Sequence, residues 1–173
     1  EHDYDVDVMP PQVVDQRIVS SRRIRGLLTE GGDVRTAHQL LARPYRLRGE
    51  VEEGEGRGGK IGFPTANIVP PERKVVPREG VYAVRAQREG DGDEAPRREG
   101  MMNIGTRPTF EDDGAKHLEV HLFNFEGDLY GEQLRIEFVD RIRDEREFDG
   151  PEALKRQLSE DRSRCKKALD ELF

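Results

Sequence analysis

A chain of 173 residues is long enough for one well-packed domain with a small appendage, whereas two domains of about 100 to 150 residues would be cramped. Charged residues make up 38% of the sequence and hydrophobic residues 34%, but the apolar residues recur in ordered patterns, so we expect a folded protein with charged loops. The formal net charge of −7 argues against a general nucleic-acid binder, because affinity for the phosphate backbone comes from lysine and arginine.

Cysteine content and hydropathy bear on the compartment. Cys165 is the single cysteine, so no intramolecular disulfide can form, and no cluster of cysteine and histidine suggests a structural zinc site. No stretch approaches the roughly 20 apolar residues of a membrane span, and the first residues lack the pattern of a signal peptide. We therefore expect a cytoplasmic protein with no membrane partner.

Two short helices are predicted first. Ser20 or Ser21 can cap a helix that stops at Gly31 and Gly32, and Asp33 can cap a second helix that ends before Pro44. Alternation of apolar and charged residues begins at Tyr45. We place a boundary near Arg43, which separates a helical appendage (1–43) from the main domain (44–173).

Short strands dominate the main domain. Alternation predicts strands at 45–52, 81–87, 101–104, 118–125 and 134–139, and Arg141 and Arg143 can extend the last one. Short strands separated by glycine and proline suggest an antiparallel barrel. The stretch 89–100 has little to bury and is predicted to be a mobile hairpin loop.

A closing helix should begin at Pro151, where a missing N–H is tolerated. One face of this helix carries apolar residues: Leu154, Leu158, Cys165, Leu169 and Leu172. We therefore expect Cys165 to be a small core residue with an inert thiol.

A glycine-rich run follows the first strand. Gly54, Gly56 and Gly59 match GxGxxG, and residues 54–60 match the first seven positions of a P-loop. Both motifs fail on context, because Ile61 stands where a P-loop needs Ser or Thr, and Pro64 opposes the helix that both motifs require. The run can be a loop that covers phosphates, as in protein kinases, or an ordinary glycine hairpin.

The next residues, Pro-Thr-Ala-Asn, suggest ligands for a cation. Pro64 favours an extended backbone, in which Thr65 and Asn67 point to the same side. Their neutral oxygens would suit Mg²⁺ that arrives with a nucleotide, because Mg²⁺ takes negative charge from phosphates. The alternative is a turn in which Asn67 bonds its own backbone.

The predicted strand 118–125 places a carboxylate among aromatic residues. Glu119, His121, Phe123 and Phe125 share one face, and Glu119 could accept a proton from a hydroxyl that attacks a γ-phosphate. The alternative is a solvated glutamate. His121 could be a second base or a flanking polar contact, and we expect a structural role because one base suffices for phosphoryl transfer.

The sequence leaves the roles of Lys60, Arg57 and the stretch 103–108 undecided. Lys60 and Arg57 could neutralise phosphates or simply be solvated. The stretch 103–108 could line a pocket or merely turn.

Five motifs in order resemble one known family: GKIGFPTANI, GVYAV, MNIGTRPTF, LEVHLFNFEGDLYGEQL and RIRDEREFDGPEAL. They are similar to bacterial riboflavin kinase, which is usually the C-terminal module of bifunctional riboflavin kinase/FMN adenylyltransferase, also called FAD synthetase. The resemblance covers about 43–173. It implies a mainly β fold, a six-stranded antiparallel Greek-key barrel with a C-terminal helix, here preceded by the helical appendage.

The resemblance also implies site residues. It implies that Thr65 and Asn67 bind Mg²⁺ together with ATP and that Glu119 is the catalytic base. It places ATP on Gly58, Lys60, Gly62, Phe63, Pro64, Thr65 and Asn67. It implicates Arg143 and Glu145 in flavin binding. Asn124 departs from the family, which commonly has aspartate there.

Residues 19–25 (VSSRRIR) look like the motif that closes the family's adenylyltransferase domain, with Arg22 in place of threonine. The histidine-bearing nucleotide motif of that domain is absent from the sequence, so we expect this chain to make no FAD. We interpret 1–43 as a helical remnant of an adenylyltransferase domain, which a longer natural chain could include.

The sequence therefore predicts an ATP:riboflavin 5′-phosphotransferase that converts riboflavin and ATP to FMN and ADP. A barrel that binds flavin or nucleotide without turnover is the first alternative. An OB-like barrel that binds single-stranded nucleic acid is the second, although aromatic residues are only 6% of this acidic chain.

Overall fold

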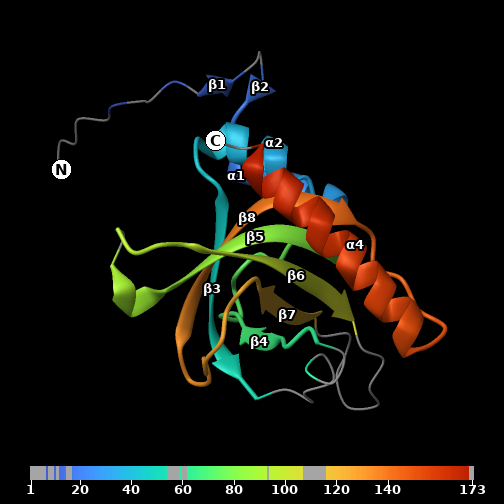
Figure 1. Cartoon of the computed structure of the whole chain (residues 1–173). Helices are drawn as coiled ribbons and strands as arrows, with labels where there is room; N and C mark the ends of the chain where they lie inside the picture. The colour runs from blue at the N-terminus through green and yellow to red at the C-terminus, as the bar shows by residue number, and fades with distance from the viewer. Residues whose placement is uncertain are drawn as a thin grey trace.

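Figure 1 shows the computed structural model, which describes residues 7, 10, 12–14, 17–53, 59, 62–92, 94–106 and 116–171. Gly58 and Lys60 of the predicted ATP loop lie outside the described residues, as do Arg57, Arg107, Pro108 and Leu172.

The main domain is a closed barrel of antiparallel strands with the order β3-β4-β7-β6-β5-β8. The strands are β3 (Tyr45–Glu52), β4 (Ala66–Val69), β5 (Gly80–Arg88), β6 (Arg98–Thr106), β7 (Lys116–Leu122) and β8 (Gln133–Arg143). Consecutive β5, β6 and β7 pair in turn, and β8 returns to lie beside β5, which is a Greek key. The predicted six-stranded Greek-key barrel is confirmed.

Two details of the predicted strands are wrong. The sequence did not predict β4, a strand of four residues directly after Pro64 and Thr65. The strand predicted at 118–125 ends at Leu122, because Asn124 takes a left-handed backbone with φ of 54°. Phe125 therefore leaves the strand, and it packs against the barrel interior instead of sharing the face of Glu119.

Side chains that alternate along each strand fill the barrel interior. Leu47, Val51, Ile68, Tyr82, Val84, Met102, Ile104, Val120, Ile136 and Phe138 are buried in this cluster. The rings of Tyr82 and Phe138 meet edge to face with centroids 5.3 Å apart. Because these side chains pack the barrel interior, the larger of the two cavities lies outside it, against the outer faces of the strands.

Helix α4 (Pro151–Asp170) covers part of the outer face of the barrel, as Figure 1 shows. A second hydrophobic cluster joins this helix to the sheet, and Cys165, Ala168 and Leu169 of α4 belong to it with Val81 and Val139. Cys165 is fully buried, as predicted, and burial raises the pKa of its thiol to about 12.

Two helices sit at one end of the barrel in Figure 1: α1 (Ser21–Gly26) and α2 (Val34–Leu41). Ser20 and Asp33 cap them through Arg23 N and Thr36 N, as predicted. The π-helical turn η1 (Leu27–Gly31) continues α1 and stops at Gly32, whose φ is 63°. A side chain at Gly32 would also lie 2.6 Å from Arg141 and Tyr82, so glycine is required there.

The helical segment, which comprises α1, η1 and α2, contributes side chains to the core of the barrel. Leu28, Val34 and Ala37 belong to the same buried cluster as the barrel interior. Arg78 N donates to Leu28 O at 2.8 Å, and Arg35 pairs with Asp140 of β8 at 3.0 Å. The division at residue 43 remains a prediction, but the hydrophobic core crosses it.

The remaining elements are small. The strands β1 (Val13–Val14) and β2 (Arg17–Ile18) form a hairpin before α1, and η2 (Glu89–Asp91) is a short turn between β5 and β6. The hairpin loop predicted at 89–100 ends earlier, because β6 begins at Arg98. Within the described part of the chain, no helix combines the length and the apolar composition that crossing a membrane needs.

Candidate active site

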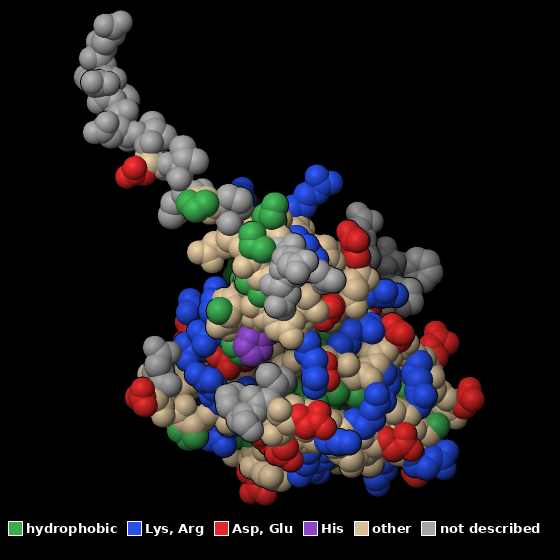
Figure 2. Space-filling view, turned by 90° about the horizontal axis from the view of Figure 1, so that it is seen from above, with side chains coloured by type: hydrophobic (Ala, Val, Ile, Leu, Met, Phe, Trp, Pro, Cys, Tyr) green, Lys and Arg blue, Asp and Glu red, His purple; other side chains and the backbone are tan. Residues whose placement is uncertain are grey.

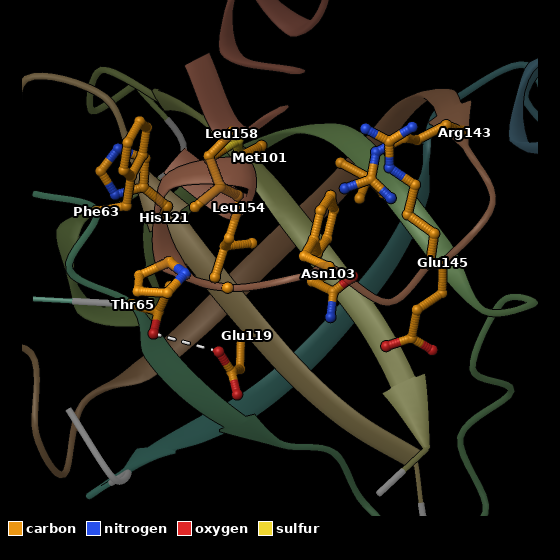
Figure 3. Close-up of a pocket in the computed structure, with 15 residues that line it drawn as sticks. Phe63, Thr65, Met101, Asn103, Glu119, His121, Arg143, Glu145, Leu154 and Leu158 are labelled. Carbon is orange, nitrogen blue, oxygen red and sulfur yellow. Dashed lines mark hydrogen bonds between the residues drawn. The ribbon is translucent and has the colours of Figure 1, made fainter. Parts of the chain in front are cut away.

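A cavity of about 530 Å³ lies between the outer face of the barrel and the first turns of α4. Strands β5, β6 and β7, the segment after β8 and the residues before β4 form its walls, as Figure 3 shows. Apolar side chains make up much of the lining: Phe63, Val81, Met101, Phe148, Leu154 and Leu158. A cavity of this size and character suits a small aromatic ligand.

Polar residues form a row across three neighbouring strands. Asn67 of β4 is the direct partner of Glu119 on β7, and Glu119 is in turn the partner of Asn103 on β6. Side chains of directly opposed residues lie on the same face of a sheet, so these three share the outer face. Glu119 and Asn103 line the cavity, and in the strand register Glu119 lies between Asn67 and Asn103.

Thr65 completes this polar group. Its hydroxyl donates to Oε2 of Glu119 at 3.4 Å, the dashed line in Figure 3. Thr65 and Asn67 flank Ala66, which packs against the barrel interior, so the predicted alternation holds. The structure thus brings together the two predicted metal ligands and the predicted base.

The oxygens of Thr65, Asn67 and Glu119 are of the type that Mg²⁺ prefers. The first two are neutral and would depend on phosphates for charge. Among the described residues, no group of three or more His, Cys, Asp and Glu side chains could hold a metal ion.

His121 holds the residues before β4 against the barrel. Its Nδ1 lies 2.8 Å from the carbonyl oxygen of Pro64, and its ring meets Phe63 and Phe123 edge to face with centroids 5.3 and 5.8 Å apart. Burial lowers the pKa of His121, so the neutral ring is favoured, with Nδ1 as donor to Pro64 O. This contact fixes the position of the neighbouring Thr65, which agrees with the structural role expected for His121.

Arg143 and Glu145 line the opposite side of the cavity. Glu145 projects toward β6, where its carboxylate lies directly against Gly105 and would collide with any side chain there. Arg143 points its guanidinium at Asp161 of α4, with Nη2 2.8 Å from Oδ2. Contact of either residue with a flavin stays a prediction.

A second, smaller cavity of about 150 Å³ adjoins the first. It is lined by Pro64, Thr65 and Ala66 together with Val120, Asp128 and Tyr130. Tyr130 is 55% exposed, which is unusual for a large ring. Thr65 borders both cavities, whereas Glu119 and Asn103 line the larger one.

The sequence prediction missed residues that line the cavity or lie behind its wall. Asn103 was left open between a pocket and a turn, and alternation along β6 could have placed it opposite the interior residues Met102 and Ile104. Asp161 and Gln157 were not singled out, although a charged residue on the apolar face of a helix is an available signal. Gly62, predicted to contact ATP, is exposed with φ of 85° and precedes this site directly.

Comparison with known proteins gives a family match that spans most of the chain. The family model described as riboflavin kinase matches residues 41–169. A bifunctional riboflavin kinase/FMN adenylyltransferase of Listeria monocytogenes is 39% identical over 158 residues, which are 91% of this chain and 48% of that protein. The protein of the same name from Bacillus subtilis is 41% identical over 83% of this chain and 44% of its own length.

Two solved structures share the fold. One, named as a macrolide-efflux protein from Streptococcus pneumoniae, is 36% identical with a TM-score of 0.80 over 91% of this chain and 50% of its own. Riboflavin kinase from Trypanosoma brucei, at 22% identity and a TM-score of 0.51, covers 75% of this chain and 79% of its own, and supports the fold alone.

The extent of these matches bears on the helical segment. This chain spans about half the length of the curated relatives it matches. Because the Listeria match covers 91% of this chain, it extends beyond the family model into the residues before 41. The helical segment is therefore shared with bifunctional relatives.

Proposed function

Because the chain belongs to the riboflavin kinase family, we propose that its site transfers the γ-phosphate of ATP to the 5′-hydroxyl of riboflavin, giving FMN and ADP. The main support is the position of Glu119, which lines the larger cavity and accepts a hydrogen bond from Thr65, a residue that borders both cavities. A phosphoryl transfer needs an acceptor and a donor in line, with a base at the acceptor hydroxyl.

The larger cavity supports binding of the flavin. Its aliphatic and aromatic walls, among them Met101, Phe148 and Leu158, suit a flat tricyclic ring. Arg143 and Glu145 on the far wall would contact the flavin, and the ribityl chain would extend toward Glu119. The 5′-hydroxyl would then end at the junction of the two cavities.

The smaller cavity and the residues before β4 support binding of ATP, because Phe63, Pro64 and Thr65 border the two cavities. We place the ATP phosphates on Gly58, Lys60, Gly62, Phe63, Pro64, Thr65 and Asn67. The nucleoside would lie toward Asp128 and Tyr130, which line the smaller cavity. Binding at this side leaves the larger cavity to the acceptor.

The proposal includes Mg²⁺ on the oxygens of Thr65 and Asn67. When bound with ATP, Mg²⁺ would neutralise charge on the phosphate oxygens. The structural support is the shared direction of Thr65, Asn67 and Glu119, which presents three oxygen donors to one place.

Glu119 would act as the general base. Its carboxylate accepts the proton of the 5′-hydroxyl as that oxygen attacks the γ-phosphorus, and the bond to the β-phosphate oxygen breaks, so ADP leaves. Asn67 and Asn103 are the register partners of Glu119 on the neighbouring strands, and Thr65 donates to its carboxylate. Positioning of the two substrates supplies most of the remaining acceleration.

We also propose limits to this activity. The family model over residues 41–169 is that of riboflavin kinase, so we expect FMN and no FAD from this domain, and the adenylyltransferase domain of the bifunctional relatives would belong to a longer natural chain. A cytoplasmic location is consistent with Cys165 as a buried free thiol. Figure 2 shows acidic and basic side chains interspersed over the face at the α1 and α2 end, which does not favour nucleic acid as a partner there.

Incubation with riboflavin, ATP and Mg²⁺, followed by chromatography, tests the proposal. We expect FMN and ADP in equal amounts, no FAD, and no FMN when Mg²⁺ is removed with EDTA. Flavin binding without any FMN from folded protein would replace the kinase with a flavin-binding module.

A further inference from the structure

The guanidinium of Arg143 is held by α4 on the side of the cavity proposed for the flavin. Its Nε lies 3.0 Å from both carboxylate oxygens of Asp161, and its Nη2 lies 2.8 Å from Oδ2. Asp161 is fully buried, at 0% exposure. Arg143 also donates from Nη1 to the carbonyl oxygen of Asp144 at 2.8 Å. A bidentate pair of this kind fixes the direction of the arginine as well as its charge.

Gln157 extends the same arrangement by one helical turn. Its Nε2 donates to Oδ1 of Asp161 at 2.8 Å, and its Oε1 accepts from Nη2 of Arg146. Residues four apart on a helix lie on one face. Asp161 and Gln157 therefore hold Arg143 and Arg146, the two arginines on either side of Glu145.

The ring of Phe148 lies against both arginines. The guanidinium carbons of Arg143 and Arg146 are 5.6 and 5.0 Å from its centroid. Arg143, Glu145, Arg146 and Phe148 all line the larger cavity. One buried carboxylate thus organises a whole wall of the cavity without lining it.

We infer that Asp161 is a positioning residue for the acceptor: with Gln157 it holds the segment 143–148 in the form that receives the flavin. This inference rests on the proposed function, because it takes the ligand of the larger cavity to be riboflavin. Without Asp161 the side chains of Arg143 and Arg146 lose their fixed directions. Riboflavin must then order them when it binds, which lowers its affinity. The proposed ATP site is built from β4 and β7, and the hydrogen bonds of Asp161 to Arg143 and Gln157 do not reach either strand. Loss of Asp161 should therefore change ATP binding little.

The test compares Asp161→Asn with wild type and with Glu160→Gln. The second variant makes the same carboxylate-to-amide change at the neighbouring exposed position of α4. Riboflavin binding is measured by flavin fluorescence without ATP or Mg²⁺, and KM for each substrate is measured separately. We expect Asp161→Asn to raise Kd and KM for riboflavin about tenfold, the cost of ordering one or two long side chains, with KM for ATP within about twofold.

Loss of a buried charge can also unfold the protein, so Gln157→Met is the second variant. It keeps the Arg143–Asp161 pair but removes the hydrogen bonds of Gln157 to Asp161 and Arg146. We expect a rise of about threefold in KM for riboflavin alone, because one side chain loses its partner.

The outcomes separate the two proposals. Unchanged riboflavin binding in folded Asp161→Asn, or in Gln157→Met if the first variant does not fold, would overturn the positioning role only. Equal changes for ATP and riboflavin would show a merely structural role and would also overturn it. Wild-type protein that binds no riboflavin would overturn the proposed function and this inference with it.

Discussion

Leu28→Ala tests whether the helical segment belongs to the barrel core. Leu28 is 1% exposed and lies in the same cluster as the barrel residues Tyr82 and Phe138. Replacing a buried leucine with alanine removes its apolar surface and leaves a cavity, which together cost about 3 kcal/mol of the free energy of unfolding. In a chain of this size that loss lowers the Tm by about 6 to 12 °C.

Ile18→Ala is the matched control for this change. Ile18 precedes α1 and is 57% exposed, so its truncation should change the free energy of unfolding by less than about 0.5 kcal/mol. Thermal unfolding followed by circular dichroism gives both values. Equal Tm values for the two variants would refute the packing of the helical segment into the barrel core.

Three further predictions concern single side chains. Thr65→Val should raise KM for ATP about tenfold because the hydroxyl is lost, whereas Thr65→Ser, which keeps a hydroxyl, should have the wild-type KM. Steady-state kinetics measure both values, and an unchanged KM for ATP in Thr65→Val would contradict the ligand role. Because burial lowers the pKa of His121 in the folded state, the unfolded chain takes up the proton at a higher pH than the folded chain does. The free energy of unfolding should therefore fall as the pH drops below about 6.5. Urea titrations should show a smaller fall for His121→Asn, and an equal fall would show that His121 is not the cause. Cys165, with a thiol pKa of about 12, should react with a thiol reagent only after denaturation, and fast labelling of native protein would contradict its burial.

Alternation along single strands explains why much of the barrel and site could be predicted. It separated Glu119 from Leu118 and Val120, and the structure has Glu119 on the outer face and its neighbours inside. Capping by Ser20 and Asp33 was equally local and is confirmed. Features that depend on a few consecutive residues were therefore accessible.

Features that depend on pairing between distant residues were not accessible from periodicity. The row of Asn67, Glu119 and Asn103 follows from the register of β4, β7 and β6, which no single strand encodes. β4 was missed because its four residues follow a proline and also fit a turn. Phe125 was misplaced because Asn124 reverses the chain one residue after Phe123.

The pairing of α4 with the end of β8 and the segment after it could not be predicted from periodicity either. Apolar periodicity predicted the helix and its buried face, but it gave no reason for the buried Asp161. That reason is Arg143, which lies on another element 18 residues earlier. Only the folded chain brings the two charges together.

Turnover of Glu119→Gln shows whether Glu119 is the base of a riboflavin kinase. The amide keeps the size of the side chain and its place beside Thr65, but it cannot accept the proton. With riboflavin binding verified in the same sample, we predict that kcat for FMN formation falls about 10² to 10⁴-fold. A kcat close to that of wild type would contradict the account.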